Sequence, residues 1–97
     1  MDRNIPDSDF WDRVDQIIDL ANKQSKEVPN GDVSASLLYA VSRFNAFITA
    51  ITSEDKEQLK NNKKEAIEYF SDQYKKMLSE NIDIFIENYE EYLKNQK

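Results

Sequence analysis

The sequence predicts an all-α fold, a small bundle of three to four helices in one domain (residues 1–97) with a mostly buried central second helix. Three observations support this. Apolar residues recur every three or four positions along each long segment, which is the period of an amphipathic helix. No segment keeps the apolar–polar alternation of a half-buried strand. Pro29 and Gly31, the lone glycine of the chain, stand together at the clearest break.

The first helix is expected from Asp9 to Lys26, with candidate N-caps at Asp7 and Ser8. Its apolar residues fall on one face about 120° wide, and most of its acids lie opposite. The apolar face comprises Phe10, Trp11, Val14, Ile17, Ile18 and Ala21, and the acidic stripe comprises Asp12, Asp15 and Asp19. Two separate faces indicate an amphipathic surface helix.

The second helix is expected from Val33 to Thr52. Pro29 disfavours helix in the residue before it, Asn30-Gly31 favours a turn with positive φ, and Asp32 is the expected N-cap. The helix is apolar or small nearly all round, which is typical of a helix buried on most sides.

Ser53 is the expected N-cap of a short, weakly apolar helical piece, and the main third helix is expected from Asn62 to Leu78. A second apolar stripe between residues 82 and 93 is rotated by roughly 80–100° from the first, at about 100° per residue. This favours a break at 79–81 and a fourth helix ending near Asn95. One bent helix from residue 54 onward is the alternative. Residues 1–8 and 95–97 are expected to be flexible.

The composition excludes many kinds of site. The chain has no cysteine and no histidine, so disulfides, thiolate or histidine catalysis and zinc fingers are excluded. One glycine is too few for a phosphate-binding loop. A net charge of −6 disfavours nucleic acid and acidic membrane surfaces as partners. We therefore expect no cofactor, no nucleic-acid or membrane partner, no secretory leader and a cytoplasmic location.

Arg43, Asn45 and Tyr39 form the candidate binding or buried polar site. Arg43 and Asn45 lie in the middle of the most apolar segment, and a buried arginine must be paired because an unpaired buried charge is costly. Tyr39, four residues earlier, should share a flank with Arg43. The pair either stabilises the core, with Arg43 bound to an acid of another helix, or binds an anion or a partner carboxylate.

Two surfaces are candidates for interaction. Ile84 and Tyr92 fall outside the main apolar stripe of their helix, so either they support self-association or burial near the break explains Ile84. The acidic stripe Asp12, Asp15 and Asp19 is expected to be a solvated face. It could instead bind a hard cation or, as an acidic mimic of nucleic acid, a basic protein surface. We predict no metal site.

Four glutamates carry the enzymatic alternative. Glu65-x-x-Glu68 and Glu87-x-x-Glu90 have the spacing found in the magnesium sites of all-α nucleotide pyrophosphohydrolases. That chemistry needs four carboxylates that converge on two metal ions inside the bundle. Glu65, Glu68 and Glu87 lie off the centres of their stripes, which argues against catalysis.

The chain resembles a family of short proteobacterial proteins, the domain of unknown function with family number 3144. Three segments carry the resemblance, which extends from about Phe10 to Tyr92: Phe10-Trp11, Ser36–Phe47 and Glu87–Tyr89. The resemblance implies a bacterial, soluble, standalone domain. No activity is assigned to the family, so it implies no catalytic residues.

Together these observations favour a small, acidic, non-enzymatic protein–protein interaction or regulatory module, with a homodimer as one form of it. The alternative is a metal-dependent nucleotide hydrolase-like or small-ligand-binding helical domain.

Overall fold

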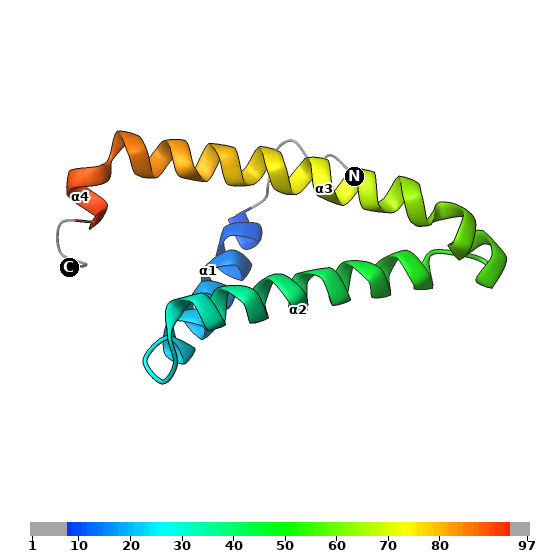
Figure 1. Ribbon diagram of the computed structural model, residues 1–97, viewed down its shortest axis with the longest axis horizontal. Coiled ribbons are helices and arrows are strands. Elements are labelled where there is room, and N and C mark those ends of the chain that lie inside the picture. Colours follow the sequence, from blue (N-terminus) through cyan, green and yellow to red (C-terminus); the bar gives the residue numbers. More distant parts are fainter. Residues whose placement is uncertain (1–7, 94–97) are drawn as a thin grey trace. The chain divides into compact units, whose positions relative to one another are not determined.

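Residues 8–93 are described by the computed structural model, and they form four helices and no strand (Figure 1). The helices are α1 (Ser8–Gln24), α2 (Asn30–Ile51), α3 (Lys56–Glu87) and α4 (Tyr89–Leu93). The all-α prediction is therefore confirmed. The chain divides into two compact units, Met1–Ala46 and Phe47–Lys97. Of the termini predicted to be flexible, Ser8 begins α1, and residues 1–7 and 95–97 lie outside the described residues.

In the first unit, α1 ends two residues before the predicted end. Asp9 in its first turn and Lys23 in its last turn both complement the helix dipole. Beyond Gln24 the backbone closes a turn, in which the Ser25 amide donates to the Ala21 carbonyl at 2.9 Å and the Val28 amide donates to the Gln24 carbonyl at 3.1 Å. These bonds satisfy carbonyls that the end of the helix would leave without partners.

The α1–α2 junction differs from the prediction. α2 begins at Asn30, so Gly31 lies in its first turn, and no described glycine has a positive φ. The Pro29 carbonyl accepts hydrogen bonds from the Asp32 and Val33 amides at 3.0 and 3.3 Å. The predicted left-handed turn and the Asp32 N-cap are therefore wrong. Pro29 lies directly before the first helical residue, where its lack of an N–H costs nothing, and Asp32 is a first-turn acid.

The predicted burial of the second helix is also not found. Val33, with 5% of its surface exposed, is the one buried hydrophobic residue among the described residues. Farther along α2, Tyr39 and Phe44 are each 63% exposed. The apolar face of α1 is exposed as well, with Trp11 at 56% and Ile17 at 53%, so it does not form a layer that covers α2. Apolar composition identified the helix correctly but not its surroundings.

In the second unit, Asp55 caps α3 instead of Ser53. Its backbone is extended, with φ −155° and ψ 178°, and its Oδ1 accepts from the Gln58 amide at 2.8 Å. The Gln58 Oε1 accepts in return from the Glu54 amide at 2.6 Å. This reciprocal arrangement is a capping box shifted by one backbone amide. Ser53 is not the cap because its hydroxyl donates to the Thr49 carbonyl at the end of α2, at 2.8 Å.

The predicted break at residues 79–81 does not exist. α3 runs through these residues without interruption for 32 residues, and Asn81 donates its side-chain amide to the Met77 carbonyl of the same helix at 2.8 Å. The helix ends at Glu87, and its C-cap is Asn88, whose backbone and side-chain N–H groups both donate to the Ile84 carbonyl, at 3.1 and 2.9 Å. The alternative of one bent helix from residue 54 onward is therefore closer to the structure, in which α3 is continuous and the break before α4 lies at Asn88.

The break at Asn88 brings two aromatic rings together. The centroids of Phe85 and Tyr92 are 5.4 Å apart with an interplanar angle of 70°, an edge-to-face contact. Residues seven apart in a continuous helix are separated by about 10 Å along its axis. The change of direction between α3 and α4 therefore makes this contact possible.

None of the helices in residues 8–93 has both the length and the apolar character that a bilayer-spanning helix needs.

Candidate interaction surfaces

Tyr39 and Arg43 share one flank of α2, as predicted. The guanidinium carbon of Arg43 lies 5.1 Å from the centroid of the Tyr39 ring, which is a cation–π contact between residues four apart. Both side chains are exposed, and no polar or charged side chain is buried among the described residues. In the described structure Arg43 is therefore an exposed charge. The pair is a surface feature that presents a cation and an aromatic ring together.

Asn45 does not join this pair. It is two residues from Arg43, which at 100° per residue places it about 200° around the helix. It is half-buried and has an interaction partner of its own. The structure therefore brings together two of the three predicted residues of the polar site and separates the third.

The carboxylates do not form a metal centre. All three acids of the stripe Asp12, Asp15 and Asp19 are exposed, and residues 8–93 contain no group of three or more acidic side chains placed to hold a metal ion. Glu65 and Glu87 lie on the same continuous helix, 22 residues and roughly 33 Å apart at 1.5 Å per residue. Without the predicted break, the two Glu-x-x-Glu pairs cannot converge within one chain.

A seam of mostly apolar side chains runs along α3. We define the α3 seam by positions that alternate three and four residues apart, the spacing of coiled-coil contact positions. Its members are Ile67, Phe70, Tyr74, Met77, Asn81 and Ile84. Ile67 is 55% exposed and Met77 48%, and α3 contains no buried residue. The expected break at residues 79–81 divides this seam, so it was not predicted, although its three–four spacing is readable in the sequence.

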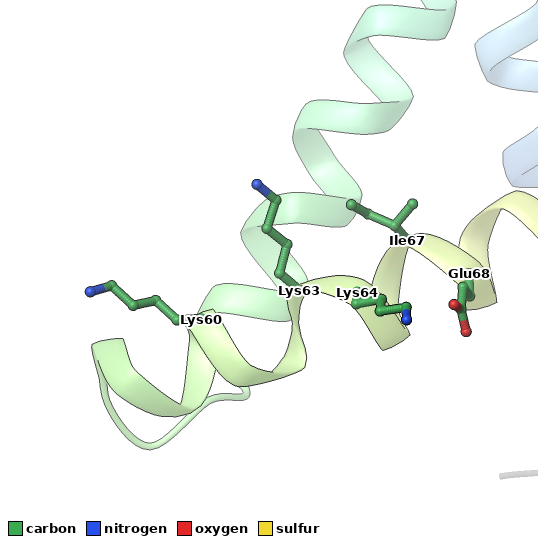
Figure 2. A pocket seen from close by; sticks show the side chains of 5 residues that line it. All are labelled: Lys60, Lys63, Lys64, Ile67 and Glu68. Carbon is green, nitrogen blue, oxygen red and sulfur yellow. The ribbon is translucent and has the colours of Figure 1, made fainter.

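The seam continues into a shallow hollow at the N-terminal end of α3. Figure 2 shows that its lining residues, Lys60, Lys63, Lys64, Ile67 and Glu68, come from successive turns of this one helix. The Lys60 ammonium lies 3.4 Å from the carboxylate of Glu57, but both side chains are largely exposed and such a pair contributes little to stability. The hollow is therefore lined by three lysine side chains, one apolar side chain, Ile67, and one acid, Glu68.

Ile84 and Tyr92, the predicted self-association residues, lie at the other end of α3 and in α4. Ile84 is the last member of the α3 seam and is 45% exposed. Tyr92 is 44% exposed and contacts Phe85. Both side chains are therefore accessible in the described structure.

Comparison with known proteins agrees with the fold. The chain is similar to a solved structure with the description "NMR structure of the protein NB7890A from Shewanella sp", at 38% sequence identity and a TM-score of 0.76. The similarity covers 95% of this chain and 98% of the other. A search of curated proteins found no match. A family model described as "Protein of unknown function (DUF3144)" matches residues 10–86, and the chain therefore belongs to this family.

Proposed function

We propose that this protein is a non-enzymatic protein–protein interaction module of the bacterial cytoplasm, in which other polypeptide surfaces cover its exposed apolar helix faces. The observation that carries the proposal is the exposure of large apolar side chains on all three long helices. Leu20 of α1 is 57% exposed, Phe44 of α2 63% and Ile86 of α3 66%.

Exposure on this scale is unfavourable for an isolated chain. Burial of apolar surface contributes about 25 cal/mol per Å², so each large side chain left in water forgoes on the order of 1 kcal/mol. Monomeric proteins rarely expose apolar patches larger than a few hundred Å², and larger patches usually mark interaction sites. The aromatic residues and Arg43 on α2 are also of the types enriched in the centres of protein interfaces.

The described side chains also support binding over catalysis. General acid–base or metal catalysis needs several groups that converge on one point. The acids of α1 and α3 are exposed and spread along helices, and the exposed Arg43 contacts an aromatic ring. Such an arrangement suits recognition by surface complementarity.

Site-specific photo-cross-linking in the native host tests the proposal. A benzophenone side chain at Phe44 should form adducts with other polypeptides. The same group at Ser42, which is exposed about 160° around the same helix, should form few. Equal adduct yields at the two positions, or adducts confined to the chain itself at Phe44 and at Met77 of the seam, would overturn the proposal.

A further inference from the structure

We infer that a second copy of this chain covers the α3 seam, with the two α3 helices antiparallel and Phe70 of each facing Tyr74 of the other. This inference rests on the proposed function and names the partner. It is carried by the spacing of the seam, the distribution of charge along α3 and the apolar area that the helix exposes.

The seam has the form of a coiled-coil contact. Ile67, Phe70, Tyr74, Met77, Asn81 and Ile84 alternate at three and four residues over nearly three heptads. The uninterrupted helix of 32 residues is about 48 Å long at 1.5 Å per residue, so it can carry the whole seam and the flanking charges.

Charge fixes the direction of pairing. Within α3, residues 56–64 contain four lysines and one glutamate, a net charge of +3, whereas residues 79–87 contain three acids and no basic residue, a net charge of −3. A parallel pair of α3 helices would place like charges side by side, and an antiparallel pair would place each basic end against an acidic end. Like charges across an interface are unfavourable and opposite charges fix its register, so antiparallel pairing is favoured.

The exposed area is sufficient for a stable dimer. Six large apolar side chains on and beside the seam are between 43% and 55% exposed: Ile67, Tyr74, Met77, Leu78, Ile84 and Phe85. At ~200 Å² for a side chain of this size, together they expose roughly 550 Å². Apolar atoms make up about 57% of a typical interface, so this corresponds to about 950 Å² per partner, compared with about 800 Å² in a standard interface.

The register follows from matching the two ends. With Phe70 facing Tyr74, Ile67 faces Met77 and Lys63 faces Asn81 of the second copy. Four of the residues that line the hollow of Figure 2 are spaced i, i+3, i+4 and i+7: Lys60, Lys63, Lys64 and Ile67. Four residues with this spacing form the hole that receives one side chain in coiled-coil packing. In this register Asn81 enters the hole, and the adjacent Glu80 lies within reach of the Lys63 ammonium.

The oligomeric state and a charge swap provide the first test. Light scattering should show a dimer, and Lys63→Glu should raise its dissociation constant about tenfold or more, because the substitution occurs twice in the interface. Lys75→Glu is the matched control, since it changes the net charge equally from a position outside the seam, and it should have little effect. The double variant Lys63→Glu/Glu80→Lys should recover most of the affinity. A monomer at every concentration, or equal effects of the Lys63 and Lys75 variants, would overturn the inference.

Disulfide trapping tests the direction of the helices, and the absence of native cysteine makes it clean. A mixture of the Lys63→Cys and Asn81→Cys variants should form a mixed disulfide dimer upon mild oxidation, and each variant alone should cross-link poorly. Efficient self-cross-linking of Lys63→Cys would indicate parallel helices and overturn the antiparallel arrangement.

These outcomes are distinguishable from failure of the proposed function. A monomer that still forms adducts with other proteins at Phe44 and Met77 would overturn only the second copy as partner. A monomer that forms adducts only within itself would overturn both.

Discussion

Replacement of Asp55 by alanine should remove the N-cap of α3 and destabilise the protein. Asp55 Oδ1 is 2.8 Å from the Gln58 amide, and Gln58 Oε1 is 2.6 Å from the Glu54 amide, so one substitution disturbs a reciprocal pair. The first-turn amides of a helix have no partner inside the helix, and a side-chain cap satisfies one of them.

The expected loss is about 1 kcal/mol of unfolding free energy, near the middle of the range for N-cap substitutions. It should not be much larger, because Asp55 is exposed and water can reach the Gln58 amide after substitution. Asp55→Asn keeps the acceptor and loses only the attraction of the carboxylate to the helix dipole, so it should cost about 0.3 kcal/mol. Ser53→Ala should also cost less than Asp55→Ala, because Ser53 bonds the Thr49 carbonyl and does not cap α3.

Urea denaturation followed by circular dichroism measures these differences, with protein concentration held constant because association adds to apparent stability. In a thermal scan, 1 kcal/mol corresponds to a decrease in Tm of about 4–8 °C for a domain of this size. The reasoning is refuted if Asp55→Ala is within 0.3 kcal/mol of the parent while Ser53→Ala loses about 1 kcal/mol. That result would place the cap at Ser53.

Three further substitutions test other parts of the structure. Gly31→Ala should raise the unfolding free energy by about 0.5 kcal/mol, since a Cβ at Gly31 meets nothing within 4 Å and the backbone is helical. A lower Tm for this variant would instead indicate that Gly31 adopts a positive φ, as the sequence predicts. A double-mutant cycle with Tyr39→Leu and Arg43→Gln should give a coupling of about 0.5 kcal/mol, and strictly additive losses in urea unfolding would exclude the cation–π contact. Asn88→Ala removes the side-chain donor to the Ile84 carbonyl. The substitution should extend α3 and so separate the ring of Tyr92 from that of Phe85. Unchanged nuclear Overhauser contacts between these two rings would contradict this prediction.

Periodicity predicted the existence of the helices well because it reports local backbone preference. The first helix was predicted within two residues of its observed ends, since Ser8, Asp9 and the turn before Pro29 all act locally. The predicted N-cap of α3 was wrong because neighbouring side chains compete for that role. Ser53 and Asp55 can both cap a helix, and the engagement of the Ser53 hydroxyl with α2 determines which one does.

The candidate site depends on a different kind of information. Arg43 was interpreted as a buried charge because its neighbours in sequence are apolar, but apolar composition does not specify what covers a helix face. The Tyr39–Arg43 contact was predictable because it depends only on spacing within one helix. The rotation between the two apolar stripes was interpreted as a break, although α3 is continuous and its apolar residues simply extend over more than one face.

The continuity of α3 restricts how the length of this chain can change. One residue inserted between Ile67 and Ile84 would rotate every later side chain by about 100° about the helix axis, so the two halves of the seam would point in different directions. Seven inserted residues would rotate them by only about 20° and leave the seam nearly in phase. Relatives that keep this surface should therefore differ in length within α3 by whole heptads, and single-residue insertions and deletions should be confined to the turns before Lys56 and after Glu87.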